Sequence, residues 1–282
     1  MVVLSPIVKL DAKDTFGVLN VLPIDLATVR LQDVVLKGTF RFKKTYREIV
    51  SAGGLHDFLK FRGRILLSLI MRDEIIANFS PKKYARAIDS LMPDSYTTID
   101  GETYEGEYSL SLSEIERIHS QNKELVELCP NCQPIGLVKG CSTKQIDYHI
   151  MLLKSLGIED FVIHVGDFFR RGDPGMIRRA KSYSLRARKH AKCLFLYGMG
   201  SQKRSLEFSF ADVFISFNHF VTARNGMRFV GTKKIKYIGS YNPQIVIDNF
   251  VEMYKNMEKL NEQVRLFQEE KTNGRRKAGK TA

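Results

Sequence analysis

The sequence contains no long apolar run. None of its hydrophobic stretches reaches the roughly 18 residues that a helix needs to cross a membrane. The first residues, MVVLSPIVKLDAKD, also lack the basic region, apolar core and small-residue cleavage site of a secretory signal. We therefore expect no membrane association, and we predict a cytoplasmic or nucleoid-associated protein.

Cysteine is scarce, with four residues among 282. A chain of this size with so few cysteines does not form the disulfide framework of a small secreted protein. Cys129 and Cys132 have the CxxC spacing of a metal site, and Cys141 and His149 could complete a set of four ligands. A structural zinc site needs all four at tetrahedral geometry, and a lone CxxC motif is a weak signal. We predict no metal and no other cofactor.

Acidic residues are fewer than basic ones. The chain has 31 Asp and Glu against 44 Lys and Arg, which gives a formal net charge of +13. Such an excess favours a polyanionic partner, of which nucleic acid is the commonest. A generally basic composition that serves solubility is the alternative explanation.

One segment concentrates this charge: FFRRGDPGMIRRAKSYSLRARKHAK, which begins at Phe168. Its cations alternate with Phe168, Phe169 and Tyr183, and cations beside stackable rings suit nucleic-acid binding. A helix with this many charges can also be a solvated surface. The predicted phosphate contacts are Arg170, Arg171, Arg178, Arg179, Arg186 and Arg188.

Apolar runs of strand length alternate with amphipathic segments of helix length, from GRILLSLIM (63–71) to ADVFISF (211–217). This alternation is typical of a parallel sheet with crossover helices, and six or more such units favour a closed barrel. No GxGxxG motif follows a strand, which argues against a dinucleotide-binding fold. We predict an α/β fold, a TIM-type (β/α)8 barrel over residues 1–240, whose less regular start forms a hairpin and the first strands. Residues 241–270 are predicted to form a helical segment and 271–282 a disordered basic tail.

The active site of such a barrel lies at the carboxyl ends of its strands. Reading those ends from the sequence gives Arg72, Asp73, Asp100, Lys139, Asp167, Gly198, Gly200 and the Asn218–His219 region. Carboxylates and a lysine above a glycine-lined floor could bind a flat polar heterocycle, because glycine lets a ring approach the backbone closely. Each carboxylate taken alone could instead be solvated or cap the next helix.

Five segments resemble, in the correct order, those of the tRNA-guanine transglycosylase superfamily. These barrel enzymes are pentosyltransferases that exchange a guanine in nucleic acid for a 7-deazaguanine. The segments are LHDFLKFRGRILLSLIM, LMPDSYTTIDGETY, PIGLVKGCS, CLFLYGMGS and ADVFISFNHFVTARNG, which together span about residues 55–235. The resemblance implies a TIM barrel in which Asp100 recognises the base. It also implies substrate binding by Ser68, Lys139, Gly198 and Gly200.

The sequence departs from this family at several positions. Leu67 replaces the Asp of the family's Asp-Ser-Gly-Gly motif, of which Ser68 remains, and Lys139 replaces the Gln of its Gly-Ile-Val-Gln-Gly strand. The family's Cys and His zinc ligands are absent. When the last segment is aligned without gaps to the family's Ala-Arg-Asn-Gly, Ile215 stands in place of the nucleophilic Asp.

A second alignment retains a nucleophile. VIHVGDFFRRGD resembles a strand end of the relatives that act on DNA. Elsewhere in those relatives, the nucleophilic Asp follows a small residue, as Asp212 follows Ala211 here. Base exchange with retention proceeds by carboxylate attack on the sugar carbon and a covalent glycosyl-enzyme, which Ile215 cannot form. This alignment makes Asp212 the catalytic residue. However, Asp212 precedes its strand, and strand starts face the opposite end of a barrel.

Three functions follow from these features. The first is a transglycosylase that inserts a 7-deazaguanine base into DNA or tRNA, with Asp100 holding the base and Asp212 as nucleophile. The second is a non-catalytic relative that binds nucleic acid as a partner subunit in a homo- or hetero-oligomer. The third is a barrel enzyme for a small phosphorylated substrate, against which the basic segments argue.

Overall fold

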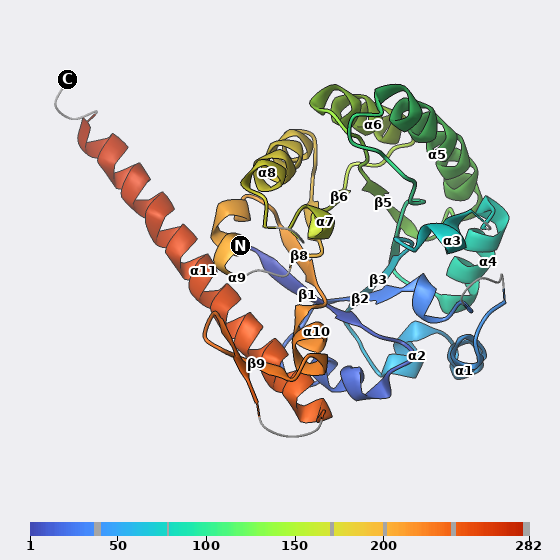
Figure 1. Cartoon of the computed structure of the whole chain (residues 1–282), viewed down its shortest axis with the longest axis horizontal. Helices are drawn as coiled ribbons and strands as arrows, with labels where there is room; N and C mark the ends of the chain where they lie inside the picture. Colours follow the sequence, from blue (N-terminus) through green and yellow to red (C-terminus); the bar gives the residue numbers. More distant parts are fainter. Residues whose placement is uncertain (37–40, 78, 170–171, 200–201, 238–240, 279–282) are drawn as a thin grey trace.

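Eight parallel strands close into a barrel in the order of the sequence, and the last strand pairs with the first (Figure 1). The computed structural model describes residues 1–36, 41–77, 79–169, 172–199, 202–237 and 241–278. The strands are β1 Val3–Val8, β2 Leu26–Arg30, β3 Arg64–Ser68, β4 Ser95–Thr97, β5 Gln133–Leu137, β6 Phe161–His164, β7 Leu194–Tyr197 and β8 Val213–Ser216. The predicted TIM-type (β/α)8 fold is therefore confirmed.

Helices surround the barrel (Figure 1). The α-helices are α1 Lys44–Ala52, α2 Leu55–Leu59, α3 Asp73–Ile76, α4 Pro81–Leu91, α5 Tyr108–Leu128, α6 Thr143–Ser155, α7 Gly166–Phe169, α8 Pro174–Arg188, α9 Gln202–Ser205, α10 Asn218–Arg224 and α11 Pro243–Ala278. Three 3-10 turns, η1 Lys13–Leu19, η2 Leu31–Asp33 and η3 Leu206–Phe208, complete the connections. Across the part of the chain that the structure describes, no helix is long and apolar enough to cross a membrane.

The start of the chain supplies the first barrel strands, as predicted, whereas the predicted hairpin is largely missing from its described residues. Strands β1 and β2 pair in parallel, with Ile7 opposite Thr28, so they are barrel strands and not a hairpin. Among the described residues before Gly54, the antiparallel pairing consists of a single bridge between Val35 and Phe42. The expected early hairpin is reduced to that bridge.

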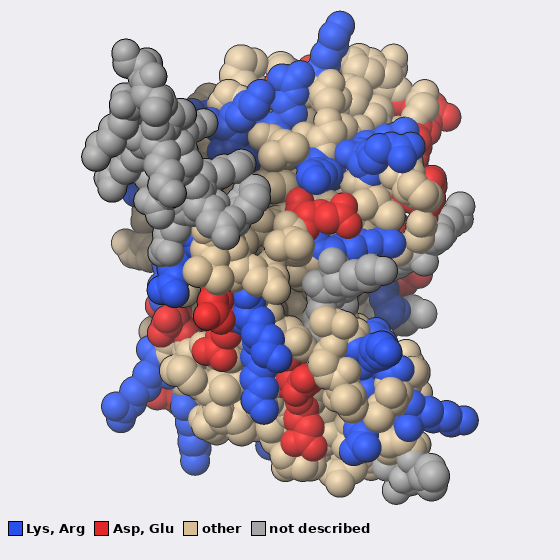
Figure 2. All heavy atoms as spheres, turned by 90° about the vertical axis from the view of Figure 1, so that its left-hand side faces the viewer, with Lys and Arg blue, Asp and Glu red and all other residues tan. Residues whose placement is uncertain are grey.

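The end of the chain forms an antiparallel hairpin and a long helix. Strands β9 (Met227–Val230) and β10 (Lys233–Lys236) pair with each other outside the barrel, and α11 follows. Helix α11 runs to Ala278, and residues 279–282 lie outside the described chain. The disordered basic tail over residues 271–282 stays a prediction. On the face that carries α11, Lys and Arg side chains form several patches separated by Asp and Glu (Figure 2).

One side of α11 packs against the barrel wall. Its buried residues recur every three or four positions, which is the spacing of one helix face. They are Val246, Phe250, Met253, Met257 and Leu260. Near the end of this buried stretch, Asn261 accepts a hydrogen bond from the Val2 amide at 2.8 Å and donates one to the Val2 carbonyl at 3.0 Å. Helix α11 therefore holds the first barrel strand in place.

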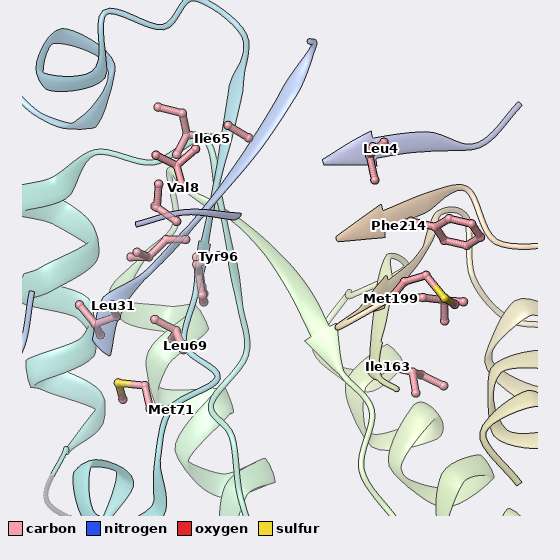
Figure 3. Close-up of a cluster of buried hydrophobic side chains, with 14 of the residues drawn as sticks. Leu4, Val8, Leu31, Ile65, Leu69, Met71, Tyr96, Ile163, Met199 and Phe214 are labelled. Carbon is pink, nitrogen blue, oxygen red and sulfur yellow. The ribbon is translucent and has the colours of Figure 1, made fainter. Parts of the chain in front are cut away.

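The strands bury side chains on both faces, because successive side chains of a strand point to opposite sides. One cluster consists of strand residues such as Ile7, Leu66 and Ile215 and fills the barrel interior. A second cluster joins the other faces of the strands to the surrounding helices. Figure 3 shows part of this outer layer, with Val8 and Phe214 among its labelled residues. Burial on both faces explains why the strands read as nearly continuous apolar runs.

Candidate functional site

Asp100 and Lys139 meet at the carboxyl-terminal mouth of the barrel. Asp100 follows β4 and Lys139 follows β5, and the Lys139 Nζ lies 2.9 Å from the Asp100 Oδ1. The Asp100 carboxylate is buried and the Lys139 side chain is mostly buried. The structure thus brings together Asp100, to which the resemblance assigns base recognition, and Lys139, to which it assigns substrate binding.

Neighbouring groups fix this ion pair. The Gly101 amide donates to the Asp100 Oδ1 at 2.9 Å. The Lys139 amide donates to Nδ1 of His149 on α6, also at 2.9 Å. Burial lowers the pKa of His149 to about 3, so its ring is neutral at physiological pH and can accept this bond. His149 therefore positions the backbone from which Lys139 extends.

The strand pattern places further side chains at the same mouth. On β5 the interior residues Ile135 and Leu137 are followed, two positions later, by Lys139. On four other strands, counting on in steps of two from the interior residues places one further side chain at the mouth. These residues are Arg30, His164, Tyr197 and Phe217. The sequence prediction missed these four. Continuing each strand's alternation to or past its end would have found them.

These missed residues form a connected group. The Arg30 guanidinium lies 4.4 Å from the centroid of the Phe217 ring, and its Nη2 is 2.7 Å from the Asp33 Oδ1. The His164 ring contacts the edge of Tyr197 at 5.3 Å between centroids. Burial raises the pKa of Tyr197 to about 12, although Arg30 opposes this shift, so the phenol remains a neutral hydroxyl. The mouth thus carries both charged and uncharged hydrogen-bonding groups.

A cavity of about 210 Å³ opens beside the ion pair. Its lining includes Lys139, His164, Asp167, Arg179 and Tyr183, from the ends of β5 and β6 and from α7 and α8. The His164 Nδ1 lies 3.5 Å from the Asp167 Oδ2. Drug-sized ligands occupy pockets of roughly 300–1,000 Å³, so a ligand of this cavity is small.

Asp212 lies at the other end of the barrel, which corrects the prediction that it is the nucleophile of this site. It directly precedes β8, and its Oδ2 accepts a hydrogen bond at 2.8 Å from the amide of Leu194, the first residue of β7. Its carboxylate also pairs with Arg188. Ile215, the other candidate position, is fully buried in the barrel interior. Neither residue offers a carboxylate to the mouth.

Ser68 and Gly198 lie at the ends of β3 and β7, where Ser68 pairs in register with Arg30 and its side chain hydrogen-bonds to Tyr197. Ser68 is fully buried. Gly198 has a φ of +84°, and a β-carbon built on it would lie 2.8 Å from the Cα of Gly166. Glycine is thus favoured at this position by the positive φ and by the close approach of two backbone segments. Gly200 lies outside the described residues.

Three of the four described arginines that were predicted to bind phosphate are paired with carboxylates. Arg179 pairs with Glu105, Arg186 with Asp147 at 3.1 Å, and Arg188 with Asp212. Arg178 is exposed, whereas Arg170 and Arg171 lie outside the described residues. Much of the charge of α8 is therefore neutralised within the protein.

The alternative zinc ligands do not converge. The Cys132 thiol donates to the Pro93 carbonyl at 3.3 Å, and the Cys141 thiol donates to Gln145 at 3.1 Å. His149 accepts from Lys139, as described above. Within the described ranges, no group of three His, Cys, Asp or Glu residues could hold a metal ion.

Comparisons with known proteins do not assign the chain to a family: no family model matches the sequence, and no match was found among the curated proteins.

Proposed function

We propose that this barrel binds a guanine-type base of DNA or tRNA at its mouth without forming a covalent bond to the sugar. The observation that carries this proposal is the Asp100–Lys139 pair, 2.9 Å apart and mostly buried at the mouth. The proposal also draws on the resemblance to guanine transglycosylases, which assigns base recognition to Asp100.

The chemistry of the pair suits guanine. Guanine carries the N1–H and N2–H2 donors next to the O6 acceptor on one edge. A carboxylate accepts from such donors, and the ammonium group of Lys139 can donate to O6. Charge-assisted hydrogen bonds of this kind are roughly twice as strong as neutral ones. The pair therefore offers an acceptor and a donor side by side, which complements this edge.

The lack of covalent chemistry is inferred from the two nucleophile positions. Glycosyl transfer with retention needs a carboxylate that can reach the sugar carbon. Asp212 is paired with Arg188 at the amino-terminal end of the strands, and Ile215 is an apolar residue of the barrel interior. Binding without transfer is the function that this arrangement supports best.

Base selectivity tests the proposal. We expect calorimetric titration of the protein to detect binding of guanine and of a 7-deazaguanine, because both present the same donor and acceptor edge. Adenine lacks the second donor and the O6 acceptor and is expected to bind at least tenfold more weakly, since an unpaired buried polar group costs about 1–3 kcal/mol. Equal affinity for adenine and guanine would show that the Asp100–Lys139 pair does not bind the donor and acceptor edge of guanine.

A further inference from the structure

The β9–β10 hairpin presents cations next to the barrel mouth. The register places Ile235 opposite Arg228 and Lys233 opposite Val230 on one face. Lys234 lies opposite Phe229 on the other face, and its Nζ donates to the Asn218 side chain at 2.9 Å. Asn218 follows Phe217 directly, and Phe217 is the mouth residue that contacts Arg30. The hairpin therefore reaches the rim of the proposed base site.

The cations of the hairpin differ from those of α8 in their pairing. Arg228, Lys233 and Lys236 are exposed, and among the described residues they form no ion pair with a carboxylate. On α8, by contrast, Arg179, Arg186 and Arg188 are paired with carboxylates, and the exposed Arg178 is its described arginine without such a pair. Exposed, unpaired cations are the groups that bind phosphates with release of counterions. The hairpin thus combines three exposed cations that lack a carboxylate partner with a position at the rim of the barrel mouth, to which Lys234 connects it.

The hairpin is held rigidly on α11. The Phe229 amide donates to Asn249 at 2.7 Å, and the Gly231 amide in the turn donates to Glu252 at 2.9 Å. Asn256 donates to the Gly231 carbonyl at 3.1 Å. The Phe229 side chain is buried below the hairpin. The cations therefore stand on a supported ribbon, and binding does not require the ribbon itself to become ordered.

The exposed face of the hairpin also carries apolar side chains. Val230 is 53% exposed and Ile235 is 37% exposed, and the register places them on the same face as Arg228 and Lys233. Such alternation of charge and apolar surface suits a sugar-phosphate backbone, whose phosphates and sugars alternate as well. A two-stranded ribbon is, in addition, an element that nucleic-acid grooves can admit.

We propose that the β9–β10 hairpin binds the sugar-phosphate backbone of the nucleic acid whose base enters the barrel mouth. This inference deepens the proposed function and rests on it for the identity of the polymer. The hairpin, and not α8, contributes most of the affinity for phosphate. The contact between Lys234 and Asn218 connects the two sites.

Two variants with the same loss of charge test the inference. The hairpin variant changes Arg228, Lys233 and Lys236 to Ala, and the control changes the exposed α8-side residues Arg178, Lys189 and Lys192 to Ala. Binding to guanine-containing single-stranded DNA and RNA is measured by fluorescence anisotropy over a range of salt concentrations. Each phosphate contact adds about 0.7–0.9 to the slope of log affinity against log salt. The hairpin variant is expected to lose about 2 to 3 from this slope and at least tenfold in affinity, the control much less.

The outcomes separate this inference from the base site. Free guanine should bind the hairpin variant as it binds the parent, and a hairpin variant with Lys233→Arg and Lys236→Arg should retain nucleic-acid binding. Unchanged slope and affinity in the alanine variant, with its melting temperature preserved, would overturn the inference, as would equal losses in the hairpin and control variants. A parent that binds guanine but neither polymer would overturn it too, while the base site would stand. A parent that binds the polymers through the hairpin but does not bind guanine would overturn the base site alone.

Discussion

Replacement of Asp100 by asparagine is expected to weaken guanine binding about tenfold to a hundredfold. The asparagine amide presents donors to the guanine donors, and an unmatched buried polar contact costs about 1–3 kcal/mol. Asp100 is only 6% exposed, so water does not readily replace the lost partner. Calorimetric titration with guanine measures the effect, and a thermal melt shows whether the variant remains folded.

Asp212→Asn supplies the matched control for this prediction. It makes the same chemical change at the other end of the barrel, and its amide oxygen can still accept the hydrogen bond from the Leu194 amide. Guanine affinity of this variant should stay within about twofold of the parent, because the residue is remote from the Asp100–Lys139 pair. A loss as large as that of Asp100→Asn would reinstate Asp212 as a residue of the base site.

Replacement of Phe250 by alanine is expected to lower the free energy of unfolding by about 3–5 kcal/mol. Phe250 is fully buried on the side of α11 that packs against the barrel, and its ring contacts His219 at 5.3 Å between centroids. Truncation of a buried phenylalanine removes apolar burial and leaves a cavity that the surroundings fill only partly. Urea denaturation, followed by circular dichroism, measures the loss.

The control for this prediction is on the same helix. Leu266 is 48% exposed, so Leu266→Ala is expected to change the free energy of unfolding by no more than about 0.5 kcal/mol. A loss below about 1 kcal/mol for Phe250→Ala would indicate that α11 contributes little to the folded barrel. Equal effects of the two substitutions would contradict the packing that the structure shows.

The barrel and the central pair could be predicted from sequence because both depend on local patterns. Strand and helix periodicities alternate regularly, and Asp100 and Lys139 stand shortly after the ends of β4 and β5, where a parallel barrel gathers its side chains. Arg30 and Tyr197 were missed, although the same pattern indicates them, because each is the last residue of an apolar strand. Continuing the interior alternation to the end of each strand reveals them.

Other parts of the site could not be predicted from the sequence because they depend on contacts between distant residues. The pairing of Arg179 with Glu105 neutralises a cation that the sequence presents as free, and nothing in the local pattern of α8 indicates it. From the sequence, Gly198 was expected to leave room for a ligand ring, and the close approach of the Gly166 backbone is visible only in the structure. Asp212 was assigned from a resemblance, although its position before a strand already indicated the opposite end of the barrel.

Covalent capture tests the central claim of guanine binding without transfer most directly. The protein is incubated with guanine-containing DNA or tRNA and with labelled guanine, and each mixture is analysed both under native conditions and after denaturation. We predict a complex under native conditions, no adduct that survives denaturation, and no incorporation of label into either polymer. A denaturation-resistant adduct, or incorporated label, would contradict the claim. The nucleophile would then have to be sought among the mouth carboxylates, starting with Asp167, which lines the same cavity as Lys139.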